Sequence, residues 1–295
     1  MEKKSTGLKH SKIVNDLMSY IYDNIEIDID VTQFYFEYGI DRFHLCKIFK
    51  KQTGKAIYET IKLIRLEKAA SILLTNKNLT ITEISNTCGY SAQTTFCRAF
   101  KTHFKQTPTY WRDGGFKEYS DLILSDLEKQ YTTNVSFNDL KRELIKVKSR
   151  NAHYHRQAGY SSNYKEIWEK MTAWVYTQNI TNYEQLAIYN NDPTLTPLDQ
   201  CNYVACIVPK DDNIDLTNSS LPVFQIHECL CMTFEIEGTD ADILMLIKWV
   251  FHEWLPNSEF EKSIISSYMI FENDYSTYKD GLLKGTYYVP VKHTY

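Results

Sequence analysis

The stretch LTITEISNTCGYSAQTTFCRAFK, residues 79–101, has the pattern of two short helices joined by a turn. The apolar spacing of residues 79–88 predicts one helix, which ends at Gly89. Ser91 then offers a side chain that can cap a second helix, whose predicted buried residues are Phe96, Ala99 and Phe100. A helix, a glycine-containing turn and a capped helix form the helix-turn-helix architecture, which places the second helix in a major groove.

A similar pattern occurs earlier, in VTQFYFEYGIDRFHLCKIFK, residues 31–50. The units align at Gly39 and Gly89, at the predicted caps Asp41 and Ser91, and in the apolar residues that follow. A first helix from Ser11 and a longer one over about 56–75 complete the pattern. Residues 1–112 are therefore predicted to form an all-α domain with two helix-turn-helix units.

Charge is distributed unevenly between the two halves of the chain. Residues 1–117 hold 18 Lys and Arg against 12 Asp and Glu, whereas residues 118–295 hold 15 against 25. Residues 40–112 alone hold 13 against 4. A basic half joined to an acidic half is typical of a polyanion-binding module fused to a module that does not bind polyanions.

The seven cysteines predict packed thiols, since their number is odd and most stand among apolar neighbours. Cys229 and Cys231 form the only close pair, and no nearby histidine or second pair completes a zinc site. We therefore expect no metal and no cofactor. No run is long and apolar enough for a membrane helix, and no signal sequence begins the chain, so we expect a cytoplasmic protein without a membrane partner.

The second half alternates predicted strands and helices and repeats its own pattern. A strand ends at Gly159 and again at Gly238, and each is followed by a helix with two tryptophans. Later strands carry IYNND at 188–192 and IFEND at 270–274, and each copy closes with a strand that contains a proline. After a connector over 113–135, residues 136–295 are predicted to form an α+β domain of two pseudo-repeated β-α-β-β units.

The N-terminal half resembles the DNA-binding domain of the AraC/XylS family of regulators. The resemblance covers about a hundred residues, and its anchors occur in the family's order: Arg65-Leu66, Ala69-Ala70, Leu73-Leu74, Ile81, Glu83-Ile84, Gly89-Tyr90, Phe96, Arg98, Phe100-Lys101, Phe104 and 107–112. It implies that two recognition helices, linked by the long helix, read adjacent segments of the major groove.

Carried over by position, the resemblance gives two sets of base-reading candidates, which are Arg42, Phe43, Cys46 and Lys47 in the first unit and Ala92, Gln93, Thr94 and Arg98 in the second. Arg98 has the chemistry to pair with guanine, Gln93 with adenine, and Phe43 or Ala92 to touch a thymine methyl group. Five basic residues are predicted phosphate contacts, with a merely solvated helix end as the alternative for the first two: Lys50, Lys51, Lys101, Lys105 and Arg112.

The first unit departs from the family pattern at two positions. Tyr35 stands where a small residue normally allows the two helices to approach, and Asp41 places a negative charge near the phosphates. We therefore expect either a changed packing of the two helices in the first unit or weaker base reading by that unit.

The C-terminal half resembles the GyrI-like effector-binding domain over about 136–295. The resemblance is carried by Arg156, Gly159-Tyr160, 188–193, Tyr203 and the closing 288–291. It implies a ligand cleft lined by aromatic residues from both repeats, with burial in the core as the competing interpretation of each. The candidates are Tyr160, Tyr164, Trp168, Trp174, Tyr189, Tyr203, Phe224, Trp249, Tyr268 and Phe271.

One position bears on the ligand's charge. Relatives that bind organic cations commonly carry a glutamate where this chain has Met269, on the same strand face as Phe271, whereas Glu272 has the opposite parity. Without a buried carboxylate to offset the desolvation of a cation, a neutral or amphipathic ligand is expected.

Together these features predict a transcription regulator, of a kind used in multidrug sensing, with promoter DNA, a small-molecule effector and RNA polymerase as partners. The alternative is that the C-terminal domain hydrolyses or sequesters a small molecule. Its clustered acid and base residues are limited to His153-x-His155 and His227-Glu228, without a third ligand or a nucleophile motif. We therefore expect that the protein is not an enzyme.

Overall fold

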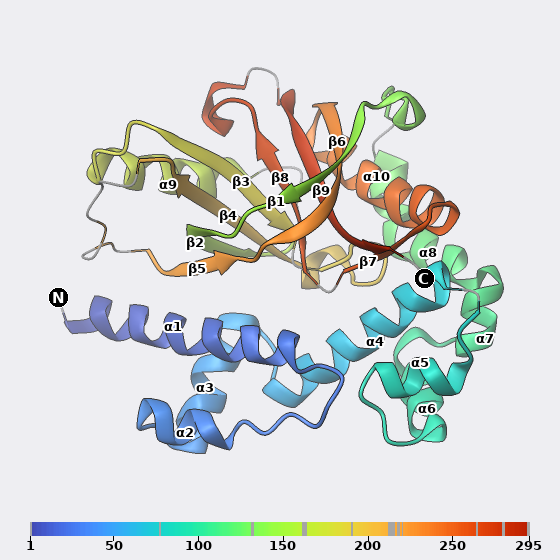
Figure 1. Ribbon diagram of the computed structural model, residues 1–295. Helices are drawn as coiled ribbons and strands as arrows, with labels where there is room; N and C mark the ends of the chain where they lie inside the picture. The colour runs from blue at the N-terminus through green and yellow to red at the C-terminus, as the bar shows by residue number, and fades with distance from the viewer. Residues whose placement is uncertain are drawn as a thin grey trace. The chain divides into compact units, whose positions relative to one another are not determined.

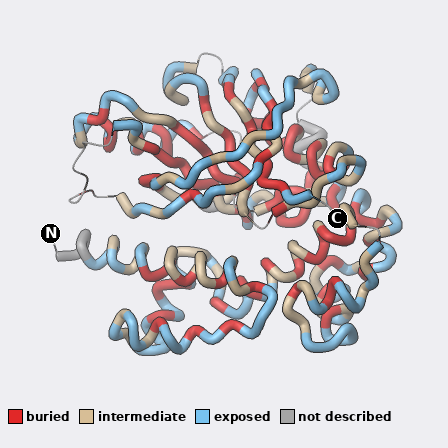
Figure 2. Tube along the Cα trace, in the orientation of Figure 1, coloured by how far each residue is buried: buried red, intermediate tan, exposed pale blue. Residues whose placement is uncertain are grey.

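The computed structural model describes residues 2–76, 78–130, 133–160, 164–189, 191–211, 216, 219, 221–263, 265–278 and 281–293. The chain divides into two compact units, Met1–Gly115 and Phe116–Tyr295. Figure 1 shows that the first is helical and that the second is built around a sheet. Buried residues form a separate core in each unit (Figure 2).

The first unit contains seven α-helices and a closing π-turn among its described residues. They are α1 (Glu2–Asp23), α2 (Thr32–Tyr38), α3 (Arg42–Thr53), α4 (Ile57–Thr75), α5 (Ile81–Thr87), α6 (Gln93–Phe104), α7 (Pro108–Tyr110) and the turn Trp111–Gly115. The two predicted helix-turn-helix pairs correspond to α2–α3 and α5–α6, and α4 is the long helix between them. The helical N-terminal architecture that the sequence predicts is confirmed.

Two groups of apolar side chains hold this unit together. The N-terminal group joins α1, α2, α3 and the first half of α4, with Leu17, Leu45 and Phe49 fully buried in it. The C-terminal group contains a row of aromatic rings in which Phe100 contacts Phe96, Phe104 and Trp111 at centroid distances of 4.6–5.6 Å. The Trp111 indole Nε1 donates a buried hydrogen bond to the carbonyl of Ala70 on α4. The closing turn is thereby attached to α4.

The turn between α5 and α6 depends on Gly89. Its φ is +73°, and a Cβ there would stand 2.6 Å from the carbonyl oxygen of Ile25 and 2.8 Å from the Arg65 guanidinium. Arg65 itself donates hydrogen bonds to the carbonyls of Ile25 and Ile27. Both the left-handed backbone and the close approach therefore require glycine.

Helix starts differ from the expectation at two places. Helix α1 begins at Glu2 rather than at Ser11, which lies within it. At α6 the N-cap is Ala92, in an extended conformation without a side-chain cap, so the expected capping role of Ser91 is wrong. Asp41 is confirmed as the cap of α3, since its carboxylate accepts a hydrogen bond from the backbone N–H of His44 at 2.9 Å.

The second unit contains nine strands among the described residues. They are β1 (Arg142–Val147), β2 (Arg150–Ala158), β3 (Tyr183–Tyr189), β4 (Asn202–Pro209), β5 (Val223–Ile226), β6 (Cys229–Gly238), β7 (Phe260–Lys262), β8 (Ser267–Phe271) and β9 (Leu283–His293). Its helices are α8 (Phe116–Gln130), α9 (Lys165–Thr177) and α10 (Asp240–Trp249), the last continued by turns over Val250–Trp254 and Leu255–Asn257. Short turns also cover Phe137–Asp139, Leu198–Gln200 and Tyr275–Thr277.

All the strand pairs are antiparallel, and the sheet order is β1-β6-β9-β8-β3-β4-β2-β5, with β7 paired to β9. The two faces of this sheet have different surroundings. One face shares a core with α9 and α10 and includes Tyr203, Met269 and Tyr287. The apolar cluster on the other face is made of strand residues alone, among them Tyr154 and Tyr268. We call these the helix-covered face and the strand-only face.

Most of the expected connector has a place in the second unit. Residues 116–130 form α8, and its Leu124 is fully buried in the core that the helix-covered face shares with α9 and α10. A fifteen-residue amphipathic helix with an apolar stripe is stabilised by covering that stripe, which a free linker does not do.

Candidate nucleic-acid interface and effector site

Helix α3 has an apolar side and an exposed side. Leu45, Ile48 and Phe49 are buried, as the sequence predicts. The predicted readers and the predicted phosphate contact on this helix all lie on the exposed side: Arg42, Phe43, Cys46, Lys47 and Lys50. Phe43 is 86% exposed. The spacing of one and four residues places these five side chains on adjoining strips of one helix face.

Helix α6 has the same arrangement, and its buried side is made of aromatic residues. Phe96, Phe100 and Phe104 recur every four residues and are fully buried. The opposite side exposes the predicted readers and a lysine: Gln93, Thr94, Arg98 and Lys101. Ala92 is exposed at the N-cap. The buried phenylalanines therefore fix which side of α6 faces outward.

Gln93 is oriented by the preceding helix. Its side-chain Oε1 accepts a hydrogen bond of 2.8 Å from the hydroxyl of Thr82 on α5. This contact ties the first residue of α6 to its partner helix and leaves the Gln93 amide nitrogen available as a donor.

Arg112 is placed differently from the other predicted phosphate contacts. It is half-buried, and its guanidinium donates a hydrogen bond of 2.7 Å to the carbonyl of Leu79, ahead of α5. Lys50, Lys51, Lys101 and Lys105 are exposed. Arg112 thus stabilises the α5 end of the unit, a contact between residues 33 positions apart that local sequence patterns do not indicate.

Six of the predicted ligand-binding aromatics meet on the helix-covered face. Tyr164 stacks on Tyr203 at 3.7 Å, and Tyr189 contacts both Tyr160 and Tyr203 edge to face. Trp168 donates its indole N–H to the Tyr203 hydroxyl at 3.0 Å and contacts Phe271. We call these six residues the aromatic cluster. All are buried in the structure, at 5% exposure or less.

Other predicted ligand residues lie outside the aromatic cluster. Trp249, at the end of α10, contacts Phe137 and Phe234 instead. Tyr268 is on the strand-only face, stacked on Tyr288 at 4.9 Å. Met269 is buried on the helix-covered face, on the same side of β8 as Phe271, as strand parity predicts.

Two further residues next to the aromatic cluster were missed in the sequence: Tyr275, which contacts the cluster, and Asp240, which contacts Tyr275. Tyr275 stacks on Trp168 at 5.4 Å, and its hydroxyl donates a 2.6 Å hydrogen bond to Asp240 at the start of α10. Asp240 is buried, and its Oδ1 has no hydrogen-bond partner among the described residues. Burial raises the pKa of Asp240 to about 7, against which the Tyr275 hydrogen bond acts. A capping pattern at Thr239 marks the helix start, but no sequence signal shows that Asp240 turns inward.

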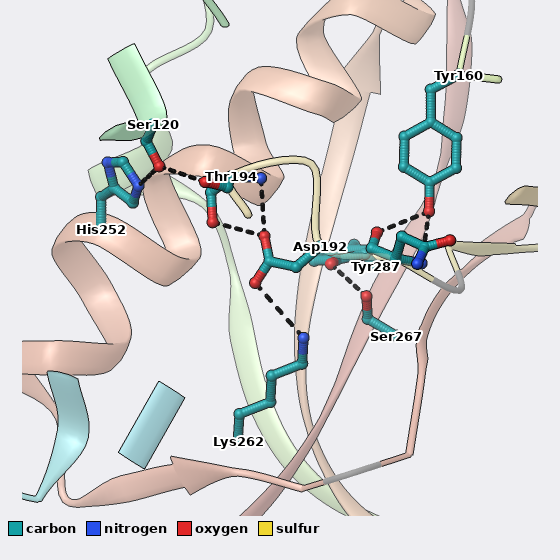
Figure 3. Close-up of polar contacts among 9 residues, drawn as sticks. Ser120, Tyr160, Asp192, Thr194, His252, Lys262, Ser267 and Tyr287 are labelled. Atoms are coloured by element: carbon teal, nitrogen blue, oxygen red, sulfur yellow. Dashed lines mark hydrogen bonds and ion pairs between the residues drawn. The ribbon is translucent and has the colours of Figure 1, made fainter. Parts of the chain in front are cut away.

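A chain of polar contacts attaches α8 to the rest of the unit (Figure 3). The Ser120 hydroxyl donates to the carbonyl of Thr194 at 2.7 Å, and His252 Nε2 lies 2.7 Å from the same hydroxyl oxygen. Asp192 accepts from the backbone and the hydroxyl of Thr194 and pairs with Lys262 at 3.5 Å. The segment after β3 is thereby held between α8 and β7.

The Ser120–His252 pair lacks the arrangement of a nucleophile and its base. Ser120 has one hydroxyl proton, which it gives to Thr194, so His252 must donate its Nε2 proton to the serine oxygen. Burial lowers the pKa of His252 to about 4, which keeps the imidazole neutral at pH 7. The contact is a structural one.

The acid and base pairs expected from the sequence do not gather into a site. His153 is buried against Trp174 at 4.8 Å, and His155 is half-buried beside it along β2. Within the part of the chain that the structure describes, no three His, Cys, Asp or Glu side chains are placed to hold a metal ion. Over the same residues, no helix is both long and apolar enough to cross a membrane.

Two family models match the chain. A helix-turn-helix domain model matches residues 37–114, and a model of the GyrI-like small molecule binding domain matches residues 141–292, just over half of the chain. Helices α3–α7 lie within the first range, and β1–β8, α9 and α10 lie within the second, which ends one residue before β9 does.

Curated relatives match the N-terminal half. The xylose operon regulatory protein of Escherichia coli (strain K12) is 36% identical over 115 residues, which are 38% of this chain and 29% of that protein. The probable transcription factor PqrA of Proteus vulgaris is 32% identical over 35% of this chain and 85% of its own length. Regulatory protein SoxS of Escherichia coli (strain K12) is 30% identical over 36% and 97%. The chain thus spans less than a third of the xylose regulator that it matches.

Among solved structures, a xylose-binding transcription activator is 37% identical over 35% of this chain and 27% of its own, with a TM-score of 0.31. The C-terminal domain of EcmrR matches 53% of this chain and 99% of its own, at 10% identity and a TM-score of 0.41.

Two helix-turn-helix pairs followed by a sheet domain define a class of protein, the DNA-binding transcription regulators with a small-molecule binding domain. The chain belongs to the AraC/XylS family and carries a GyrI-like domain as its C-terminal half. Both resemblances drawn from the sequence are confirmed.

Proposed function

We propose that this chain binds a specific promoter sequence through α3 and α6, and that a small molecule bound by the C-terminal unit changes its effect on transcription. The observation that carries the proposal is the exposed face of α6, where Gln93, Thr94 and Arg98 stand outward from a fully buried row of phenylalanines. A recognition helix needs this combination of a fixed underside and polar side chains that reach base edges.

The readers differ in the bases that they suit. Arg98 has the fork of donors that pairs with guanine O6 and N7. The Thr82 hydroxyl occupies one acceptor site of Gln93 Oε1, which leaves the Gln93 amide to pair with adenine through its nitrogen and the remaining lone pair. On α3, Arg42 and Lys47 supply donors, and the exposed Phe43 ring supplies an apolar surface for a thymine methyl group.

Phosphate contacts position the protein without specifying sequence. Lys50 and Lys101 are exposed at the ends of α3 and α6, next to the readers, and fit this role. The hydrogen bond from Arg112 to Leu79 supports a structural role for Arg112 instead.

We infer that the effector binds at the aromatic cluster. Residues from two parts of the unit meet there, β2 to β4 with α9 and the segment around β8. The strand order supports the pseudo-repeat as well. Strands β3 and β8 pair at the centre of the sheet; β4 and then β2 follow outward from β3, and β9 and then β6 follow outward from β8 in the same way. Because the cluster is closely packed, binding requires its rings to move apart, and such a rearrangement is a means by which occupancy changes the unit.

The effector is proposed to be neutral or amphipathic. Met269 leaves β8 without a charged group in the aromatic cluster, and Asp240 is the carboxyl group that contacts the cluster through Tyr275. Burial raises the pKa of Asp240 to about 7, which favours the neutral, protonated form of this carboxyl group over the charged form that an exposed aspartate has at neutral pH. A polar group on an otherwise apolar ligand would satisfy Asp240 Oδ1.

The domains are proposed to divide these tasks, with residues 1–112 binding DNA and residues 136–295 binding the effector. The attachment of α8 through Ser120 to the segment that follows β3 supports coupling through this helix, because Tyr189 of β3 belongs to the aromatic cluster. RNA polymerase is proposed as the partner through which effector binding changes transcription.

The test is selection of binding sites from a random double-stranded DNA pool by the full chain, followed by salt titration of the selected site. We expect an enriched consensus, with affinity falling steeply as salt rises because lysines displace counterions. Lys50→Ala should lower the salt slope by about one and weaken all sequences equally. If no sequence is enriched and the chain binds all DNA in a merely salt-dependent way, the proposal is overturned.

A further inference from the structure

The cysteine pair on β6 has a geometry that packed thiols do not need. Cys229 and Cys231 alternate along the strand and so point to the same face, where their Sγ atoms stand 3.5 Å apart. Cys231 is buried, whereas Cys229 is half-buried. One sulfur is therefore near the surface, and the other is buried beside it along the strand.

The pair lies on the strand-only face, away from the aromatic cluster. Strand β6 runs between β1 and β9 (Figure 1). Thr233, two residues beyond Cys231, is in register with Tyr288 of β9, and Tyr288 is in register with Tyr268 of β8. Tyr268 and Tyr288 belong to the strand-only cluster. The two thiols thus share a face with Tyr268.

The surroundings of the pair favour one thiolate. The hydrogen bond from Cys231 lowers the pKa of Cys229, and the Arg150 guanidinium acts in the same direction. That same hydrogen bond raises the pKa of Cys231, together with burial. The buried Tyr268 hydroxyl faces Cys231 and, as a hydrogen-bond partner, acts to lower the pKa of that thiol against these two effects. The half-buried Cys229 sulfur is therefore the more nucleophilic of the two, and it stands next to a second thiol.

The separation of the sulfurs indicates which centre they can hold. With bonds of about 2.3 Å to sulfur, two thiolates on a tetrahedral centre stand roughly 3.8 Å apart, and on a linear centre about 4.6 Å apart. The observed 3.5 Å fits an angular centre. A zinc ion would need further protein ligands, and the described residues offer no group of three. The pair therefore suits a trivalent element that takes two thiolates from the protein and already carries one substituent of its own.

We propose that Cys229 and Cys231 form a dithiol site for trivalent organoarsenicals, in which arsenic carries one organic group and takes two thiolates. In water the ligand is R–As(OH)₂. Two As–S bonds form and two As–O bonds break, and each hydroxyl leaves with a thiol proton as water. Arsenic stays trivalent, so no oxidant or reductant is needed.

The test uses phenylarsine oxide with the full chain, read by intact mass and by the number of thiols that remain reactive with maleimide under denaturing conditions. We expect one phenylarsenic group per chain and the loss of two thiols. A vicinal dithiol should reverse the reaction and a monothiol should not. Because the second sulfur binds intramolecularly, Cys229→Ser should weaken binding on the order of 100-fold or more.

Matched variants separate this site from the other thiols. Cys46→Ser removes an exposed cysteine and Cys97→Ser a half-buried one, and both should keep full binding. Cys231→Ser should lose binding as Cys229→Ser does, and Cys229, being half-buried, is the replacement that the fold tolerates more readily. Retention of wild-type affinity by Cys229→Ser, or absence of a one-to-one adduct in the wild type, would overturn the proposal. The outcome does not depend on DNA binding, so it is distinguishable from the test of the proposed function.

Discussion

At the scale of single residues, Gly89 shows how one position fixes the second helix-turn-helix turn. We expect Gly89→Ala to lower the free energy of unfolding by at least about 2 kcal/mol, because a left-handed backbone costs a non-glycine residue roughly 1–2 kcal/mol and the new methyl group meets the carbonyl of Ile25. Urea unfolding measures the change.

The control is Gly54→Ala, since Gly54 also has a positive φ, of +79°, but open space around its Cβ position. Gly54→Ala should lower the free energy of unfolding only by the cost of the left-handed backbone, roughly 1–2 kcal/mol. Equal losses at Gly54 and Gly89 would mean that the close approach to Ile25 and Arg65 contributes nothing.

Asp240 gives the unit a pH dependence with a definite sign. Its pKa is raised to about 7 in the folded state, while the unfolded chain titrates near 3.8. The folded chain therefore holds a proton that the unfolded chain has released, so the contribution to stability is fully present below about pH 4 and is lost as pH rises through 7. We expect the stability of Asp240→Asn to change less than that of the wild type over this range, as measured by urea unfolding at several pH values.

His252 acts with the opposite sign, which is why the variant must be compared with the wild type at each pH. Burial lowers its pKa to about 4, so its contribution is lost as pH falls from about 6.5. The tyrosines around Asp240 have raised pKa values and stay neutral throughout. If the free energy of unfolding of the wild type and of Asp240→Asn changes equally with pH, the Asp240 carboxyl group is not buried as the structure shows.

At the scale of elements, α8 lies within the connector expected from the sequence and is attached to the second unit by buried contacts. Ser120→Ala would leave the Thr194 carbonyl and the His252 Nε2 proton without partners in a buried setting. We expect a loss of about 1–3 kcal/mol in the free energy of unfolding of the second unit. Ser125→Ala is the control and should be near neutral, because Ser125 is only half-buried on the same helix and its hydroxyl donates to the carbonyl of Leu122 within that helix.

Elements whose pattern repeats within a few residues could be predicted from the sequence. The spacing of Phe96, Phe100 and Phe104 indicates both that α6 is a helix and which side is buried, and Asp41 marks the start of α3. The start of α6 was misplaced because Ala92 takes the cap position through its backbone, with no side-chain signal. Strand parity likewise placed Met269 and Phe271 on one face.

Contacts between distant residues could not be predicted in this way. Tyr268 and Met269 are neighbours in the chain but lie on opposite faces of the sheet, so a list of aromatic residues could not separate the aromatic cluster from the strand-only face. Asp240 joins the cluster only because Tyr275, 35 residues later, turns back onto α10. The inward turn of Asp240 depends on tertiary packing, which a local pattern does not contain.

At the scale of the whole molecule, the central claim is that α3 and α6 read two separate segments of one DNA site. Tyr35, which is half-buried on α2, and Asp41, which caps α3, do not remove the exposed face of α3, since all five predicted residues remain outward. Two readers in one chain should therefore contact major-groove segments about 34 Å apart, one helical turn of DNA.

The measurement that tests this claim most directly is the base preference of variants at each position of the selected site. Arg98→Ala should relax preference in one half of the site, and Arg42→Ala in the other half, about ten base pairs away, each at a cost of about 1–3 kcal/mol. Thr102→Ala, exposed farther along α6, should leave both halves unchanged. Relaxation of the same half by both arginine variants, or of neither half, would contradict the account.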